Sequence, residues 1–127
     1  MNKLNSYSTT DGTGNSISFA GFGPLSQTNA PSASASSFVH RDTLFLSQIY
    51  SYGQTTQLVK TQMQELVQTA HTTAPNASWG AYINYVDRNQ TSWGNAYYGS
   101  AVSKLKSIKT AMDPYNIFDY AQGIANA

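Results

Sequence analysis

The residues best suited to chemistry gather in an aromatic stretch between Trp79 and Tyr98. Tyr82, Asn84 and Tyr85 lie within four residues of one another there. A phenol can act as a general acid or base, so Tyr85 is the candidate catalytic group. That role requires a cation or an electron-poor ring that lowers the pKa of a phenol from its free value of about 10. The alternative interpretation is an aromatic edge of the core, which composition alone favours.

Other catalytic chemistries have few residues to use. Glu65 is the only glutamate and the aspartates are scattered, so the sequence does not indicate a paired-carboxylate site. His40 and His71 are the only histidines, and we expect no metal site from them. The absence of cysteine excludes disulfides, thiolate metal ligands and a cysteine nucleophile.

Charge is scarce, with seven basic and six acidic residues and a net charge of +1. Charged residues make up 10% of the chain, against about 25% in an average domain. Nucleic-acid binding is therefore not expected, because there is no basic field to attract phosphates. No run of about 20 apolar residues suggests a membrane span. The length predicts a single domain over residues 1–127.

The elements that would position Tyr85 begin with two strands, expected at 16–22 and 43–52, on either side of a long exposed loop. A third strand is expected at 80–87, because Tyr, Ile and Val favour an extended chain. It would place Tyr82 and Asn84 on one face and Tyr85 on the other.

Helices are expected where apolar residues recur at helical spacing, over 54–73 and 100–112, with a short helical turn near Trp93. The last helix should end at Asp113-Pro114, and its lysines, Lys109 among them, should form a solvated face. This order predicts an α+β fold, an antiparallel sheet with helices packed on one face.

An extracellular, secreted protein is expected from the low charge and the many Ser, Thr, Asn and Gln residues. Asn76 and Asn89 begin the two N-glycosylation sequons. The first ten residues show no apolar segment typical of a signal peptide.

Spaced motifs from about Asn15 to Ile124 resemble the C-terminal region of berberine bridge enzyme-like FAD-linked oxidases. Residues 15–75 are similar to the end of the substrate domain and 79–124 to the berberine bridge enzyme-like module. The motifs are Gly21-Phe22-Gly23, Phe38-Val-His40-Arg41, Tyr82-Ile-Asn84-Tyr85-Val-Asp87, Tyr97-Tyr98-Gly99, Asp113-Pro114-Tyr-Asn116-Ile-Phe118 and Gln122-Gly-Ile124.

The resemblance implies part of a larger flavoprotein oxidase fold, in which FAD is supplied by a partner domain or chain. It implies that Tyr85 takes a proton from the hydroxyl of a small-molecule substrate while hydride passes to the flavin. Asn84, Tyr82 and His40 would lie near the cofactor. Phe22 would line the substrate cavity, where it replaces the more usual tyrosine.

Two hypotheses stay open. The chain is part of an oxidase that acts on an alcohol, sugar or related substrate, and is inactive without its flavin domain. Alternatively, it is a stand-alone carbohydrate- or protein-binding or structural protein that kept the fold without catalysis.

Overall fold

The computed structural model describes residues 14–23, 25–52 and 57–126. The chain divides into two compact units. The first comprises Met1–Ala20 and Leu46–Trp79, and the second comprises Gly21–Phe45 and Gly80–Ala127. Each unit is described by itself.

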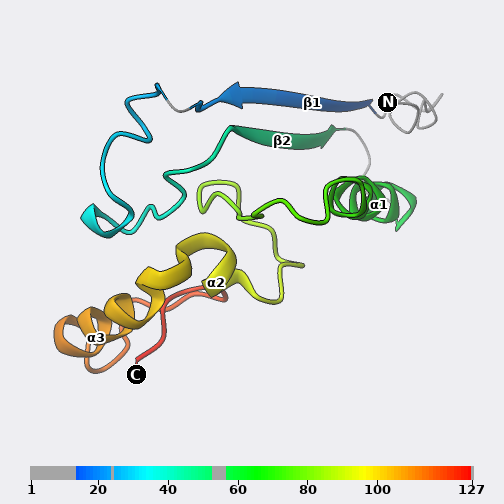
Figure 1. Ribbon diagram of the computed structural model, residues 1–127. Coiled ribbons are helices and arrows are strands. Elements are labelled where there is room, and N and C mark those ends of the chain that lie inside the picture. Colours follow the sequence, from blue (N-terminus) through cyan, green and yellow to red (C-terminus); the bar gives the residue numbers. More distant parts are fainter. Residues whose placement is uncertain (1–13, 24, 53–56, 127) are drawn as a thin grey trace. The chain divides into compact units, whose positions relative to one another are not determined.

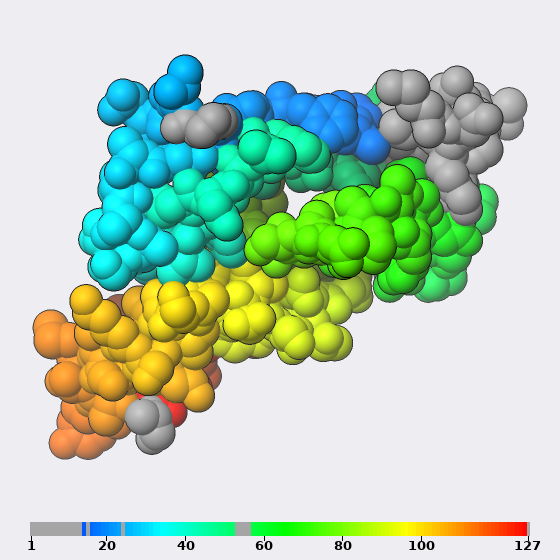
Figure 2. All heavy atoms as spheres, in the orientation of Figure 1, coloured from blue at the N-terminus to red at the C-terminus, as the bar shows by residue number. Residues whose placement is uncertain are grey.

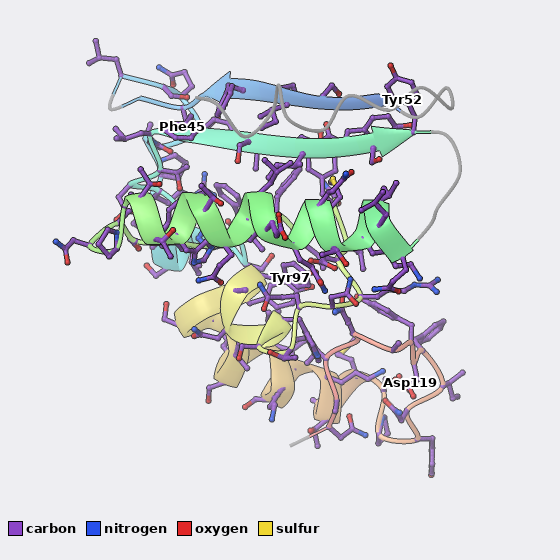
Figure 3. The ribbon with its side chains drawn as sticks, turned by 90° about the vertical axis from the view of Figure 1, so that its right-hand side faces the viewer. Phe45, Tyr52, Tyr97 and Asp119 are labelled. Carbon is purple, nitrogen blue, oxygen red and sulfur yellow. The ribbon has the colours of Figure 1, made fainter. Side chains whose placement is uncertain are left out.

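The sheet has two antiparallel strands, β1 (Gly14–Gly21) and β2 (Phe45–Tyr52), which confirms both predicted strands (Figure 1). Phe45 and Tyr52 mark the two ends of β2 in Figure 3. At one end of the sheet, a Cβ on Gly14 would lie 2.1 Å from Cζ of Tyr52. Glycine at the start of β1 therefore leaves the space that this exposed ring occupies, and a larger residue would make the ring turn away.

Helix α1 (Gln57–Thr73) shares the first unit with the sheet and runs beside β2 in Figures 1 and 3. Its buried residues are Val59, Gln62 and Leu66, a spacing that puts all three on one face. The helix is confirmed, and its expected first residues lie outside the described part of the chain.

The second unit contains α2 (Trp93–Tyr98), the 3₁₀ turn η3 (Gly99–Ala101) and α3 (Val102–Met112). These three pack against one another and form a continuous surface, yellow to orange in Figure 2. The turn between them depends on Gly99, whose φ of 46° is in the left-handed region that favours glycine. Both helical predictions are confirmed.

The expected third strand at 80–87 is wrong, because residues 83–85 and 88–92 lie in or beside turns. The Tyr85 N–H donates to the Tyr82 carbonyl at 2.9 Å, and the Gln90 N–H donates to the Asp87 carbonyl at 3.0 Å. The Asp87 carboxylate also accepts from the Asn89 N–H at 2.8 Å. Side chains such as Asp that bond the backbone two residues on favour turns over strands. The fold class is nonetheless α+β, with two strands among the residues that the structure describes.

In its described residues, the expected long loop between the strands contains the 3₁₀ turn η2 (Ala33–Ala35), and the Asn29 and Arg41 side chains bind its backbone. The Asn29 amide donates to the carbonyls of Phe22, Gly23 and Thr43 at 2.9–3.2 Å. The Arg41 guanidinium donates to carbonyl oxygens of Thr28 and Phe38, and to Ser36 Oγ at 2.7 Å. These bonds fix both the end of β1 and the segment that carries Phe38.

None of the described helices is both long and apolar enough to cross a bilayer.

Candidate functional site

An aromatic cluster in the second unit gathers four of the predicted site residues around Phe38. The centroid of the Phe38 ring lies 6.5 Å from that of Phe22, 5.6 Å from that of His40 and 6.3 Å from that of Tyr82. The Tyr85 ring lies a further 5.3 Å from Tyr82. Each contact is edge-to-face, the geometry that aromatic quadrupoles favour. Residues up to 63 positions apart in the sequence therefore form one side-chain cluster.

A turn gives Tyr82 and Tyr85 their mutual orientation. An extended strand would have sent their side chains to opposite faces, whereas the observed turn brings the rings together at 87°. Asn84 lies between them in sequence, and its side-chain amide donates to the Tyr82 hydroxyl at 2.7 Å. Asn84 and Tyr85 are both exposed, so two phenols and an amide form the open rim of the cluster.

His40 anchors the cluster to α2. Its Nε2 lies 3.2 Å from the carbonyl oxygen of Tyr97, within hydrogen-bond distance. Gly80 packs on the same ring, since a Cβ there would lie 2.3 Å from Cε1 of His40. The imidazole is half-buried and held on both sides, which suits a positioning role.

A buried polar network holds the turn that carries Tyr85. The Tyr97 side chain is only 2% exposed, and its hydroxyl accepts from the Asp87 N–H at 3.1 Å. The same hydroxyl donates to Gln122 Oε1 at 3.2 Å. The Gln122 amide in turn donates to the carbonyl of Asp87 at 2.8 Å. Both backbone groups of Asp87 are therefore bound by buried side chains, and Figure 3 places Tyr97 on α2.

The next residue on α2, Tyr98, is a phenol with a shifted acidity. Burial raises the pKa of Tyr98, and the neighbouring Tyr120 raises it further by charge repulsion and a side-chain hydrogen bond. Both effects favour the neutral phenol, so Tyr98 is a poor candidate for a base.

Three residues of this arrangement carried no assigned role in the sequence-based prediction. Phe38 is the hub of the cluster, while Tyr97 and Gln122 support the turn. All three belong to the motifs that carry the family resemblance, so the signal was present, but no local spacing connects them.

Asn84 and Tyr85 are exposed at the rim of the cluster, and an amide and an aromatic ring are groups that could contact one face of a flat ring such as isoalloxazine. The residues of the cluster offer no free cationic side chain for the phosphates of FAD. Arg41, the cation beside the cluster, already donates to loop oxygens and lies 4.8 Å from the Phe38 ring centroid. In the described part of the chain, no group of three or more His, Asp or Glu side chains could hold a metal ion.

The two sequon asparagines lie on the surface. Asn76 follows α1 in the first unit, and Asn89 belongs to the turn after Asp87 in the second. Both residues are exposed.

Comparison with known proteins points to oxidases. The family model described as "Berberine and berberine like" matches residues 81–125, which include the turn with Tyr82 and Tyr85. The chain is 35% identical over 109 residues to a chitooligosaccharide oxidase of Gibberella zeae, covering 80% of this chain and 22% of the relative. It is 31% identical over 108 residues to a carbohydrate oxidase of Microdochium nivale, with the same two coverages. An uncharacterized FAD-linked oxidoreductase of Bacillus subtilis, YgaK, is 32% identical over 87 residues, or 68% of this chain and 19% of the relative.

No solved structure matches the chain. The chain spans about a fifth of the length of the curated relatives it matches. The family model covers the motifs from Tyr82 to Ile124, and the structure brings Tyr82 and Tyr85 together with Phe22 of an earlier motif. The chain therefore belongs to the berberine bridge enzyme-like family of FAD-linked oxidases and corresponds to their C-terminal region.

Proposed function

We propose that this chain forms the substrate-facing part of an FAD-dependent oxidase that converts an alcohol or sugar hydroxyl to a carbonyl. The observation that carries the proposal is the turn in which the Tyr85 phenol stands exposed beside Tyr82 and Asn84, on top of a buried support. A rigid support beneath an exposed acid–base group is what a catalytic constellation requires.

Oxidation of an alcohol removes a hydride from carbon and a proton from the hydroxyl. FAD, when bound, supplies the hydride acceptor. Tyr85 accepts the hydroxyl proton as its phenolate and becomes the neutral phenol, and its exposed position on the turn leaves the oxygen open to a substrate. When FAD is bound, Tyr82 and Asn84 would contact its flat ring, while His40 fixes the loop and α2 to each other. Phe22 supplies an apolar wall beside Phe38.

The names of the relatives suggest the substrate class. A chitooligosaccharide oxidase and a carbohydrate oxidase each align with most of this chain, so a free sugar or short oligosaccharide is the proposed substrate. Such substrates suit an exposed aromatic rim, because sugar faces pack on aromatic rings. Secretion and glycosylation at Asn76 and Asn89 complete the proposal, and the exposure of both asparagines is compatible with it.

The test joins this chain to a flavin domain. The part of the Gibberella zeae oxidase outside its match to this chain would be fused to residues 1–127, and reduction of the flavin by chitooligosaccharides and by simple sugars would be followed under anaerobic conditions. The Tyr85→Phe variant should retain flavin absorbance and lower the rate of flavin reduction by about 100-fold or more.

The matched control is Tyr50→Phe, which removes a phenol hydroxyl from a residue that is 52% exposed and lies in the first unit, outside the cluster. It should reduce the flavin at the rate of the unmodified fusion. A Tyr85→Phe fusion that reduces its flavin as fast as this control would refute the role of Tyr85. The isolated chain should show no oxidase activity and no flavin absorbance.

The stand-alone binding protein remains a second candidate because of an exposed ring pair in the first unit. His71 stacks on Trp79 with ring centroids 4.4 Å apart and planes 12° from parallel, and both residues are exposed. A glycan array with the isolated chain separates the two functions, since binding that is lost on Trp79→Ala and kept on Tyr85→Phe would favour the binding protein.

A further inference from the structure

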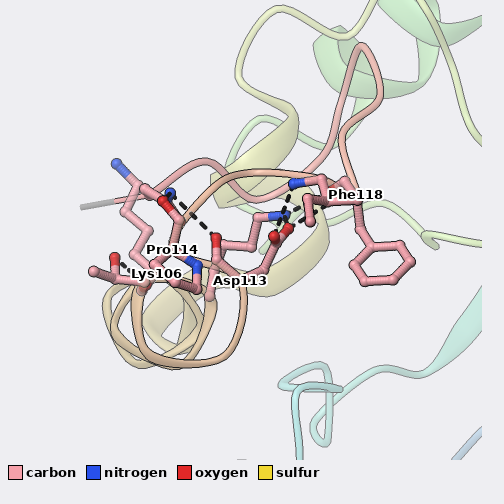
Figure 4. A network of polar contacts seen from close by, with 8 residues as sticks. Lys106, Asp113, Pro114 and Phe118 are labelled. Carbon is pink, nitrogen blue, oxygen red and sulfur yellow. Dashed lines mark hydrogen bonds and ion pairs between the residues drawn. The ribbon is translucent and has the colours of Figure 1, made fainter.

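The segment that follows α3 is held by one buried carboxylate. Asp113, 8% exposed, accepts from the Ile117 N–H at 2.7 Å and from the Phe118 N–H at 3.0 Å. Its Oδ2 also pairs with Lys109 Nζ, which donates in addition to the Phe118 carbonyl (Figure 4). Lys109 was expected on a solvated face, and this is wrong, because its side chain is only 12% exposed and ion-paired.

Asn126, near the end of the chain, makes further hydrogen bonds to the same segment. The Asn126 amide donates to the carbonyls of Asp113 and Pro114 at 3.4 and 3.3 Å. Asn116 adopts the left-handed conformation with φ 52°, which asparagine tolerates better than most residues. The backbone is therefore fixed over a stretch without helix or strand.

This fixed backbone presents large apolar side chains to solvent. We call Met112, the last residue of α3, together with Tyr115, Ile117 and Phe118 of the fixed stretch the apolar loop; they are 80%, 86%, 74% and 80% exposed. Figure 4 shows the Phe118 ring pointing away from the polar network. Asp113 and Lys109 fix the backbone of this segment, yet the four apolar side chains stay exposed within the unit. Exposed apolar groups on a preorganised backbone are typical of an interaction surface.

We propose that the apolar loop is the surface through which this chain docks onto the flavin-carrying part of its oxidase. The inference rests on the proposed function. The occupant is indicated by length, because the relatives that match this chain devote only 22% of their polypeptide to the matched region. The apolar loop lies within residues 81–125, the part that matches the family model. A module of that family needs a firm contact with the remainder of the oxidase, and ordered apolar anchors supply it.

The test measures capture without turnover. The tagged chain would be co-expressed with the flavin-carrying part of the Gibberella zeae oxidase defined above, and the captured protein and its flavin absorbance would be quantified. The Ile117→Ser/Phe118→Ser double variant should lower capture at least about tenfold, since central apolar anchors dominate binding energy. Leu25→Ser, at a leucine that is 95% exposed in the same unit but outside the loop, is the matched control and should leave capture unchanged.

Circular dichroism and the thermal midpoint of each isolated variant establish that it folds. Asp113→Asn adds a second perturbation, because it keeps every apolar side chain and loosens the backbone that presents them; it should lower capture less than the double variant. The inference is overturned if the unmodified chain captures no flavin domain, or if the double variant captures it fully. It is also overturned if the chain is a dimer that the double variant converts to monomer, which would make a second copy the occupant.

Failure of docking and failure of the proposed function give different results. If the docking inference is correct and the proposed oxidase function is wrong, capture depends on Ile117 and Phe118. The covalent fusion then leaves its flavin oxidised with every sugar. If only the docking inference is wrong, the fusion reduces its flavin at a rate that depends on Tyr85, and the loop variants are captured as fully as the unmodified chain.

Discussion

The Tyr97 hydroxyl donates to Gln122 Oε1 at 3.2 Å, joining α2 to a segment 25 residues further along the chain. Through this bond and two others, both the N–H and the carbonyl of Asp87 are held in place. Asp87 is two residues from Tyr85, so the position of the candidate catalytic phenol depends on a contact that lies beneath it.

Replacing Tyr97 with phenylalanine should therefore destabilise the protein. The change leaves the part-buried Asp87 N–H and the buried Gln122 Oε1 without this partner, which costs about 1–3 kcal/mol of unfolding free energy. Urea unfolding measures that loss, and hydrogen exchange of the Asp87 amide should accelerate. Tyr115→Phe, at an exposed tyrosine, is the control and should change neither. Equal stability of the two variants would mean that the network does not hold the turn.

A second prediction concerns Gly80, whose position next to His40 leaves no room for a methyl group. The Cβ of Gly80→Ala would lie 2.3 Å from Cε1 and 2.6 Å from Nδ1 of His40, so the imidazole must move. The move breaks the contact between Nε2 and the Tyr97 carbonyl. Nuclear magnetic resonance should report a changed environment of the His40 ring, and the thermal midpoint should fall. Gly23→Ala, where a Cβ meets nothing within 4 Å, is the matched control. Unchanged His40 resonances would contradict the close packing.

The predictable parts of the fold are the ones whose signals are local. Val59 and Leu66 recur at helical spacing, and this alone places α1. The strand expected at 80–87 is wrong because its Tyr, Ile and Val residues have strand propensity, which lost to two successive turns. The first is closed by the bond from the Tyr85 N–H to the Tyr82 carbonyl, and the second by the bonds that Asp87 accepts. Strand propensity produces a strand only where a neighbouring strand can pair with it, and a single sequence does not show which segments are neighbours.

The candidate site was partly predictable for a different reason. Tyr85, Tyr82 and Asn84 follow from the motif, and the structure brings them together with Phe22 and His40. The support beneath them joins residues 25 and 35 positions apart, for which the chain shows no periodicity. Contacts of that range are decided by packing in the folded unit.

A third prediction concerns alkaline pH. Burial and Tyr120 raise the pKa of Tyr98, so the folded state favours the neutral phenol more than the unfolded chain does. This contribution to stability is fully present below the ordinary phenol pKa of about 10 and is lost as pH rises through the higher folded value. Tyr98→Phe should therefore unfold at nearly the same urea concentration on both sides of this range, whereas the unmodified chain weakens. Ultraviolet titration of the two proteins should identify the late-ionising phenol, and a variant that weakens with pH as much as the parent would assign the effect elsewhere.

The last prediction uses Asp113 in the acid range. Its bond to Lys109, followed by the bonds from the Ile117 and Phe118 N–H groups, lowers the pKa of Asp113 despite an opposing effect of burial. The stabilisation is therefore present above the pKa of an unfolded aspartate, about 3.9, and is lost as pH falls through the lower folded value. Asp113→Asn should lower the thermal midpoint at neutral pH and should respond less than the parent protein to acid below pH 4. Asp119→Asn, at an exposed aspartate six residues on, is the control and should retain the midpoint of the parent at neutral pH. If Asp113→Asn has the same thermal midpoint as this control at neutral pH, the carboxylate does not hold the apolar loop. The argument that the loop is preorganised for docking then fails.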